Sequence, residues 1–270
     1  MKPLIVHKNE FKACEAAHKI LGDFQARGVE ATVLESHCLT FPVLQDHTLL
    51  IVLGGDGTIL ECARFLAGSG IPLLGINFGK VGFLSSIEPE DWPPALEKLM
   101  QNQYRLEKRM MIEAQIIRDG QVFQLGTALN DAVIRSQVLH IITLRLSVDG
   151  KSYAVYRADG IIMATPTGST AYSYSAGGPV LAPDLEAIAV TPVCPQLSCA
   201  RALVVRADAP LELTVDSNHS VRITLDGEKE MDLKKGDRIL ITKSAQTVSL
   251  IQINSVTCMK RIGYCKKRIS

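Results

Sequence analysis

The chain has 270 residues, of which 47% are hydrophobic and 21% are charged, and its formal net charge at pH 7 is +1. This length and composition predict one large domain or two ordinary ones with a sizeable core, and they exclude global disorder. The near-zero net charge argues against a protein whose main partner is nucleic acid.

Cysteine usage and the lack of long apolar segments indicate the compartment. The seven cysteines form no CxxC pair and no Cys/His set at metal-ligand spacing, so we expect a reducing environment and no structural zinc. The N-terminus has no apolar stretch of signal-peptide length, and no apolar run reaches the roughly 18 residues of a membrane span. We therefore expect a soluble cytoplasmic protein that does not enter the membrane.

The first part of the chain alternates between strands and helices. Helices are predicted from about Glu10 to Gly28, after Gly57 as far as Gly68, and from Asp91 to about Met100. Alternation of this kind predicts a parallel sheet with helical crossovers. The predicted strands are residues 3–7, 30–35, 48–53 and 72–77. The predicted apolar face of the first helix comprises Phe11, Cys14, Ala17, Ile20, Leu21 and Phe24.

One stretch in this part combines a strand, a glycine turn and a helix. Residues 48–53 form a continuous apolar run, which is typical of a strand buried on both faces, and Gly54-Gly55-Asp56-Gly57 follows. A glycine turn leading into a helix N-terminus makes a phosphate site. A carboxylate there repels phosphate, so Asp56 suggests chemistry or metal contact beside a bound nucleotide. The same four residues also occur in ordinary tight turns, where Asp is common, and the tetrapeptide alone favours that interpretation. Its position between a buried strand and a helix gives the functional interpretation equal weight.

The pattern changes after about Tyr104. Three Asp-Gly pairs, at 119–120, 149–150 and 226–227, are hairpin signals between strand-like runs. The fold class predicted is therefore an α/β N-terminal domain, residues 1–105, followed by a mostly antiparallel all-β C-terminal domain, residues 106–245. The predicted strands of this second domain are residues 110–118, 121–128, 139–148, 152–156, 161–164, 211–215, 220–225 and 238–242.

A hydroxyl-rich loop interrupts the β-rich part. After the apolar strand 161–164 the chain reads TPTGSTAYSYSAGGP, residues 165–179. Its hydroxyls offer neutral donors and acceptors, and Tyr172 offers a flat face for stacking, which suits a ribose and a base. The alternative is a Ser/Thr-rich surface loop, for which this composition is common.

Asn130 and Asp131 lie within another apolar run, ALNDAVI. Polar groups inside a strand are costly unless they are paired, and an amide beside a carboxylate can bracket sugar hydroxyls or an adenine edge. A solvent-facing bulge is the alternative. The sequence contains no GxxxxGK[ST], GxGxxG, HExxH or GxSxG motif, so any nucleotide is bound by a different device.

Taken together, these motifs resemble the NAD kinases in order and spacing. The matching stretches are GGDGT at 54–58, GINFGKVGFL at 75–84, Asn130-Asp131, and Asp159-Gly160 with the hydroxyl-rich loop. The resemblance implies an α/β domain, a β domain, and a C-terminal tail, about 246–270, that returns to the first domain. It also implies phosphorylation of the adenosine-ribose 2′-hydroxyl of NAD by ATP with a divalent metal, Mg²⁺.

The resemblance also implies roles for single residues. Asp56 looks like the general base, and Gly55 and Gly57 look like nucleotide contacts. Asn130 and Asp131 look like contacts to adenosine. Glu228 is carried over as a contact, although many members of the family have Gln there, which puts it in question. The residues that match the lining of the NAD site are Arg157, Asp159, Thr170, Ala171, Tyr172, Ser173 and Ser175.

No metal ligand is identified, and the metal is expected to rest mainly on the phosphates of the donor. Members of the family are symmetric homo-oligomers, so the resemblance implies a homodimer or homotetramer in which Asp159 completes the NAD site of a neighbour.

Two other functions share features with this sequence. Diacylglycerol and sphingosine kinases carry the same Gly-Gly-Asp-Gly device, but the hydroxyl-rich motif is of the NAD-kinase type and no amphipathic membrane-binding stretch is evident. A non-catalytic dinucleotide-binding or sensor module is the third interpretation. Asp56 argues against it, because pure phosphate binding favours a turn without an anion.

Overall fold

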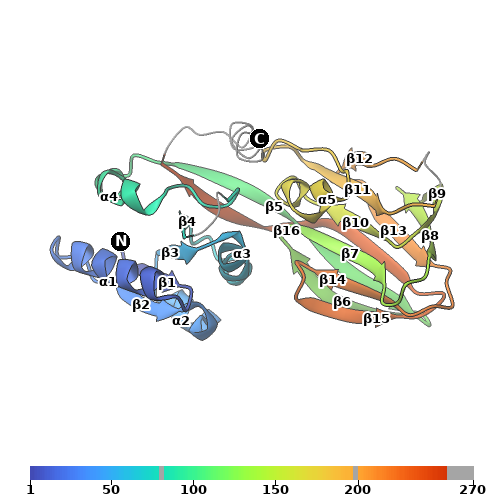
Figure 1. The fold of residues 1–270 in the computed structure, drawn as a ribbon, viewed down its shortest axis with the longest axis horizontal. Helices are drawn as coiled ribbons and strands as arrows, with labels where there is room; N and C mark the ends of the chain where they lie inside the picture. Colours follow the sequence, from blue (N-terminus) through green and yellow to red (C-terminus); the bar gives the residue numbers. More distant parts are fainter. Residues whose placement is uncertain (79–81, 197–199, 254–270) are drawn as a thin grey trace. The chain divides into compact units, whose positions relative to one another are not determined.

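The computed structural model describes residues 1–78, 82–196 and 200–253. The chain divides into two compact units, which are described separately (Figure 1). The first is Met1–Arg109 with the described residues from Thr247 onward, and the second is Met110–Gln246. The predicted bounds were 105 and 245. Most of the predicted returning tail, residues 254–270, lies outside the described residues.

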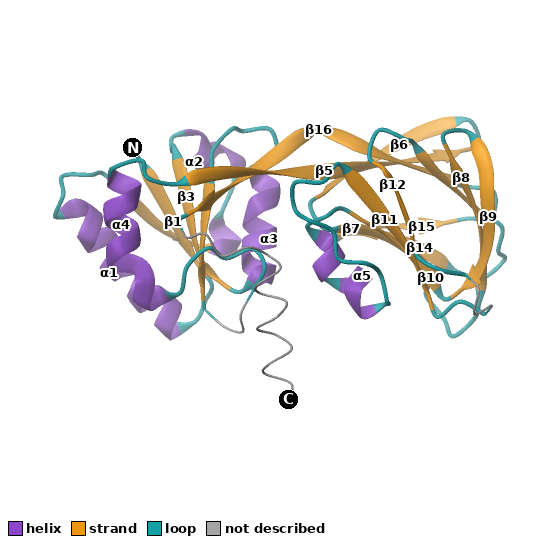
Figure 2. Ribbon diagram, turned by 90° about the horizontal axis from the view of Figure 1, so that it is seen from above, coloured by secondary structure: helices purple, strands orange, loops and turns teal. Residues whose placement is uncertain are grey.

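The first unit is built on a parallel sheet, in agreement with the predicted fold class. Its strands are ordered β2-β1-β3-β4, followed by β16. Figure 2 shows α1 and α4 on one face of this sheet and α3 on the other. No helix in the described ranges is long and apolar enough to cross a membrane. The bounds are β1 Pro3–His7, α1 Phe11–Gln25, β2 Thr32–Glu35, η1 Ser36–Cys38, α2 Phe41–Gln45, β3 Leu49–Gly54, α3 Asp56–Phe65, β4 Leu73–Asn77, η2 Pro89–Asp91 and α4 Trp92–Met100.

The buried stripe of α1 differs from the predicted face at one end. Ala13, Ala17, Ile20 and Phe24 are buried, and Phe24 packs edge-on against Trp92. Phe11 is 84% exposed, so its predicted place in the core was wrong. The reason is angular: Phe11 lies nine residues before Ile20, which places it about 180° round the helix from Ile20.

Helix α3 begins earlier than predicted. Gly55 is its N-cap residue in an extended conformation, and Asp56 and Gly57 already belong to the first helical turn. Strand β3 and the helix approach closely here, because a Cβ on Gly54 would lie 2.7 Å from Cβ of Thr58. Gly54 therefore allows the chain to turn from the buried strand directly into the helix.

The second unit consists of antiparallel strands in two sheets, again as predicted. One sheet runs β16-β13-β8-β9, with β5 also paired with β16 and β6 paired with β5, and the other runs β12-β11-β10-β7-β14-β15. Strands β5 and β16 continue from one unit into the other. The bounds are β5 Arg105–Arg118, β6 Gln121–Ala128, β7 Asp131–Ser136, β8 Ile142–Val148, β9 Lys151–Ala158, β10 Gly160–Ala164, η3 Gly168–Thr170, α5 Tyr172–Ser175, β11 Ala187–Val193, β12 Leu203–Arg206, β13 Leu211–Val215, β14 Val221–Leu225, β15 Lys229–Leu233 and β16 Arg238–Gln252.

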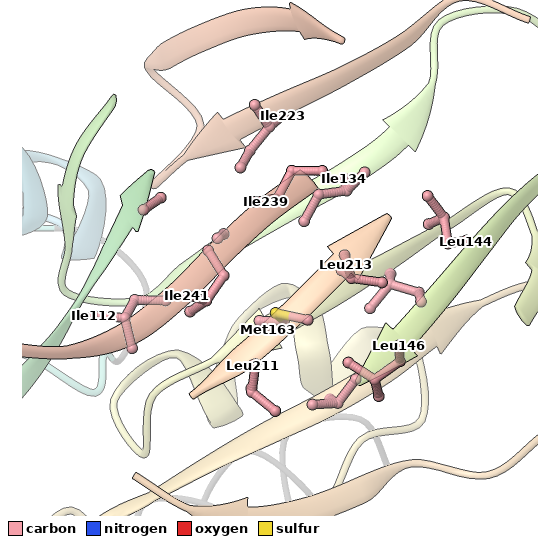
Figure 3. Packing of buried hydrophobic residues seen from close by; sticks show 14 of the residues in the cluster. Ile112, Ile134, Leu144, Leu146, Met163, Leu211, Leu213, Ile223, Ile239 and Ile241 are labelled. Carbon is pink, nitrogen blue, oxygen red and sulfur yellow. The ribbon is translucent and has the colours of Figure 1, made fainter. Parts of the chain in front are cut away.

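The core of this unit contains inward-facing residues of both sheets. Leu211 and Leu213 of β13 and Leu144 and Leu146 of β8 belong to the same buried cluster as Met163 of β10 (Figure 3). Alternate residues along these strands are buried, which is the pattern of sheets that pack face to face. Strand β10 ends beside the beginning of β7, where Ala164 pairs with Asp131, so the loop after β10 starts next to the turn before β7.

The three Asp-Gly turns of this unit were predicted from the sequence, but several of its strands were not. All three Asp-Gly pairs have positive φ at both residues, from 50° at Asp119 to 77° at Gly120, as a type I′ turn requires. Strands β11, β12 and β15 were not predicted, and β16 runs ten residues beyond the predicted end at Thr242. Asn130 was predicted inside a strand, but it lies in the turn between β6 and β7.

Candidate active site

Asp56 lies where the topology of the first unit favours a ligand. Strands β1 and β3 are neighbours, with His7 beside Leu53, and the chain leaves their carboxyl ends on opposite faces of the sheet. This is a topological switch point, the place at which open parallel sheets bind ligands. Asp56 is the first residue of α3, immediately beyond the end of β3.

Backbone groups of a later segment hold the Asp56 carboxylate. Phe83 N donates to Oδ2 at 2.7 Å and Leu84 N donates to Oδ1 at 3.1 Å. A Cβ on Gly82 would overlap with Oδ1, so only glycine fits against the carboxylate at this position. The carboxylate is partly exposed and has a fixed orientation, which a proton acceptor needs.

The segment 82–88, here called the strap, is anchored to the neighbouring strand. Ser86 N and Ile87 N donate to Gly75 O, and Asn77 N donates back to Ile87 O. These bonds fix the strap along β4, and through it they fix the two amides that hold Asp56. No local sequence pattern predicts this contact, because the donors are backbone groups 27 and 28 residues away.

A second polar corner is built in the other unit around Asn130 and Asp131. The carboxylate of Asp226, in the turn between β14 and β15, accepts hydrogen bonds from the backbone N–H groups of Leu129, Asn130 and Asp131, at 2.8, 2.8 and 3.0 Å. Burial, together with the nearby Asp226 carboxylate, raises the pKa of the Asp131 carboxyl to about 7. Asp226 was predicted only as a turn residue, so its organising role was missed.

The hydroxyl-rich loop packs directly on this corner. Thr165 N donates to Asn130 O at 2.8 Å, and the Thr165 hydroxyl donates to Leu129 O at 2.5 Å. A Cβ on Gly168 would overlap with the backbone of Asn130, so glycine is required for the close approach. The structure therefore brings the Asn130–Asp131 corner and residues 165–170 together.

Several hydroxyls of the loop are used inside the protein. Ser169 Oγ donates to Pro166 O and accepts from Leu181 N, and Ser173 Oγ lies 2.9 Å from Thr191 Oγ1. Both serines are fully buried. The hydroxyl of Ser173 thus stabilises the loop, whereas the family resemblance implied that Ser173 lines the NAD site.

Other residues of the loop face outward. Tyr172 and Tyr174, in the short helix α5, are 38% and 47% exposed, and Ser175 is exposed beside them. Thr170 and Ala171 are partly buried at the start of this turn. The ring of Tyr172 is therefore accessible at the surface, and its stacking on a base stays a prediction.

Arg157 and Asp159 lie away from this corner within the chain. The register pairs Ala164 with Asp131 at one end of β10 and Gly160 with Arg135 at the other. The four intervening steps separate the two ends by about 13 Å. Asp159 precedes Gly160, so it is at the far end from the loop, and both charged residues are exposed.

Glu228 is also exposed, but it lies two residues after Asp226 and so belongs to the hairpin that holds the Asn130–Asp131 corner. No group of three or more His, Cys, Asp or Glu side chains that could hold a metal ion is present in residues 1–78, 82–196 and 200–253.

Family models match most of the chain. Residues 42–104 match the model of the ATP-NAD kinase N-terminal domain, and residues 129–253 match that of the ATP-NAD kinase C-terminal domain. The first match contains the turn with Asp56, and the second contains the Asn130–Asp131 corner and the hydroxyl-rich loop.

Curated relatives agree with this match. The chain is 38% identical over 259 residues to an NAD kinase of Citrifermentans bemidjiense, covering 90% of each chain. It is 43% identical over 216 residues to an NAD kinase of Heliobacterium modesticaldum, covering 79% of this chain and 76% of the relative.

Two solved structures share the fold. An NAD kinase from Archaeoglobus fulgidus in complex with ATP has a TM-score of 0.80 and 26% identity, covering 97% of each chain. Yeast NADH kinase complexed with NADH has a TM-score of 0.87 at 22% identity, covering 97% of this chain and 86% of that one, a likeness of fold alone.

Proposed function

Since the chain belongs to the NAD kinase family, and so transfers phosphate from ATP to NAD to form NADP, we propose that Asp56 is the general base of this reaction. The observation that carries the proposal is the pair of hydrogen bonds from Phe83 N and Leu84 N to the Asp56 carboxylate. These bonds fix the orientation of a partly exposed carboxylate that belongs to the first residue of α3, beside the backbone N–H groups of the first turn.

In the proposed reaction, Asp56 accepts the proton of the adenosine-ribose 2′-hydroxyl as that oxygen bonds to the γ-phosphorus of ATP. The bond between the γ-phosphorus and the bridging oxygen breaks, and ADP leaves with the electron pair. The first-turn N–H groups of α3, including that of Gly57, lie where they can donate to phosphate oxygens, and Gly55 allows phosphate to approach the turn.

A divalent cation, Mg²⁺, neutralises charge on the phosphates when it is bound. The oxygen ligands of this cation are proposed to come mainly from the phosphates of ATP, with waters completing its coordination.

The NAD side of the site is proposed to lie in the second unit. Asn130 and Asp131, held by Asp226 and by the hydroxyl-rich loop, offer an amide and a carboxyl to adenosine. Tyr172 offers an exposed ring for stacking. Thr170, Ala171, Ser175 and Glu228 are proposed as surrounding contacts, and Ser173 is proposed to act by holding the loop.

The assembly proposed is a homodimer or homotetramer with shared NAD sites. Arg157 and Asp159 lie at the opposite end of β10 from the Asn130–Asp131 corner of the same chain, about 13 Å away. A contact from Asp159 to NAD therefore fits a neighbouring subunit better than its own. Symmetry requires each subunit to lend the residue that it receives.

Mixed oligomers test this arrangement. Asp56→Asn and Asp159→Ala subunits, unfolded and refolded together, would form some sites with both residues intact, and part of the wild-type rate should return. Verified subunit exchange without any recovery would assign Asp159 to its own chain or to folding.

The compartment proposed is the cytoplasm. The described residues include Cys14, Cys38, Cys62 and Cys194 as free cysteines, a state compatible with a reducing environment. Cell fractionation of the untagged protein tests this, and recovery mainly from a membrane or secreted fraction would contradict it.

The reaction itself is tested with purified protein, NAD, ATP and Mg²⁺, with NADP followed by a coupled dehydrogenase. NAD lacking the adenosine 2′-hydroxyl should bind without reacting, because most of its contact surface remains. Phosphate found on the nicotinamide ribose would overturn the assigned acceptor. The same protein assayed with diacylglycerol or sphingosine tests the lipid-kinase alternative, which none of the matches above supports.

A further inference from the structure

One buried amide in the first unit is only half satisfied. Asn77, the last residue of β4, is 3% exposed, and its Nδ2 donates to Glu88 Oε1 and Oε2, both at 3.1 Å. Its Oδ1 is buried and accepts no hydrogen bond from the described residues. Leaving a buried acceptor unsatisfied costs about 1–3 kcal/mol, and such atoms are rare in native proteins.

The orientation of this amide is fixed. Turning it over would place Oδ1 against the carboxylate of Glu88, an acceptor against an anion, and would lose both donated hydrogen bonds. Glu88 therefore holds the nitrogen and directs the oxygen elsewhere. Glu88 is the last residue of the strap, whose other end donates Phe83 N and Leu84 N to Asp56.

Asn77 lies on the same face of the sheet as the first turn of α3. A Cβ on Gly75 would lie 2.8 Å from Ile59 Cδ1, so Gly75 faces α3, and side chains two residues apart in a strand share a face. Asn77 is paired with Gly54, and Asp56 follows two residues later. The Cα atoms of Asn77 and Asp56 are therefore at most about 12 Å apart.

The hydrogen-bond acceptors around Asn77 all favour a positively charged partner. Asp56 and Glu88 are carboxylates, and the free side of Asn77 is the negative end of an amide dipole. ATP would add several negative charges. Mg²⁺ prefers oxygen ligands and keeps several waters when substrate phosphates supply much of its coordination.

We propose that Asn77, oriented by Glu88, presents Oδ1 to the hydrated Mg²⁺ that accompanies ATP, either as a ligand or as an acceptor for one of its bound waters. This rests on the proposed use of ATP and Mg²⁺. Asn77 is then a cation-binding residue and Glu88 is a positioning residue that acts through it. The strap fixes both the general base and the cation acceptor at once.

The test measures cation binding rather than turnover. Mn²⁺, a paramagnetic substitute for Mg²⁺, is titrated into the full-length protein with a non-hydrolysable ATP analogue, and bound Mn²⁺ is followed by water-proton relaxation. Asn77→Ala should weaken Mn²⁺ binding in this complex by roughly five- to thirty-fold, the worth of one good hydrogen bond. Affinity for the analogue in excess chelator should change by less than about twofold.

Two further variants separate orientation from folding. Glu88→Gln should weaken Mn²⁺ binding less than Asn77→Ala, because the amide can then turn over. The double variant Asn77→Asp with Glu88→Gln keeps a donor facing an acceptor and moves the negative charge from residue 88 to residue 77, so it should bind Mn²⁺ at least as tightly as the wild type. Gln137→Ala removes a similar amide–carboxylate contact, with Asp232, from the second unit and should leave Mn²⁺ binding unchanged.

Each possible result in Asn77→Ala assigns a different role to the amide. Equal losses of affinity with and without metal in Asn77→Ala would overturn the proposal in favour of a direct nucleotide contact. Unchanged Mn²⁺ binding with lowered thermal stability would overturn it in favour of a structural amide. Should Asn77→Ala not fold, the order of Mn²⁺ affinities among wild type, Glu88→Gln and the double variant decides the question. Wild-type protein that binds Mn²⁺ with the analogue but makes no NADP would refute the proposed reaction and not the role of Asn77.

Discussion

Asp56 and Asp131 are two carboxyl groups in opposite surroundings. Asp56 is partly exposed and receives two backbone hydrogen bonds, from Phe83 and Leu84. Asp131 is 6% exposed, its carboxyl accepts no hydrogen bond from the described residues, and the Asp226 carboxylate is nearby. The first arrangement keeps an anion oriented for use, and the second makes ionisation costly. The comparison shows that the amide and carboxylate partners of a carboxyl, more than its residue type, set what it can do.

The largest effect is expected from removing the negative charge of Asp56. Asp56→Asn should lower kcat by roughly 10²–10⁴, the usual contribution of a general base, while the fold and NAD binding persist. An amide also faces one of the two backbone donors with its own N–H, so thermal stability should fall slightly. Steady-state kinetics and calorimetry with NAD measure the two effects, and near-normal turnover would remove Asp56 from the proposed role.

Asp131 should make the free energy of unfolding depend on pH. The pKa of Asp131 is raised to about 7 in the folded state, above its value in the unfolded chain. The contribution of the protonated carboxyl to the free energy of unfolding is therefore fully present below about pH 4 and is lost as pH rises through 7. Asp131→Asn should therefore match the wild type near pH 4 and exceed it above pH 7, by about 4 kcal/mol at most. Chemical denaturation across this range measures the difference.

Parallel stability curves for wild type and Asp131→Asn would show that Asp131 ionises normally. The same experiment on Asp208→Asn, an exposed carboxylate paired with Arg206, provides the control and should give no such divergence.

A smaller effect is expected from moving the Asp56 carboxylate without removing it. Gly82→Ala puts a methyl group against Oδ1, so the carboxylate or the strap must shift. A displacement of about 1 Å from the productive geometry costs on the order of 10²-fold in rate. Gly22→Ala, in α1 where a Cβ would meet nothing within 4 Å, is the matched control. Equal kcat values for the two variants would mean that the strap tolerates the methyl group.

The smallest effect concerns the exposed ring of the hydroxyl-rich loop. Tyr172→Ala should weaken NAD binding by about 1–3 kcal/mol, the worth of a base–aromatic stack, and should leave kcat at saturating NAD nearly unchanged. Tyr174→Ala removes a ring of similar exposure two residues away and should affect binding less. Calorimetry on both variants measures this, and equal affinities for wild type and Tyr172→Ala would return Tyr172 to an ordinary surface position.

The surroundings of Asp56 and Asp131 were predicted from the sequence only in part. The strand, turn and helix around Asp56 follow from an apolar run and three glycines, both local signals. The type I′ turns follow from Asp-Gly pairs for the same reason. The strap amides that hold Asp56, and the Asp226 carboxylate that holds three amides about 95 residues away, leave no local pattern.

Composition predicted the hydroxyl-rich loop but not the use of its hydroxyls. Thr165, Ser169 and Ser173 bond within the protein, whereas Tyr172 and Ser175 face outward, and only packing decides which residue does which. Strand β15 was missed because three of its five residues are charged, and β11 because it contains Pro192, which sequence rules exclude from sheet interiors.

Strand β16 has a consequence for how the protein is made. Leu250 near its end pairs with Leu73 of β4, so the parallel sheet of the first unit is completed by one of the last described segments of the chain. During synthesis on the ribosome, β4 emerges long before β16, so its edge near Leu73 stays open, whereas the strap already pairs with Gly75 and Asn77. Until β16 arrives, a nascent chain carries an incomplete sheet whose open edge near Leu73 other chains can join, and unpaired edges of this kind make folding intermediates prone to aggregate.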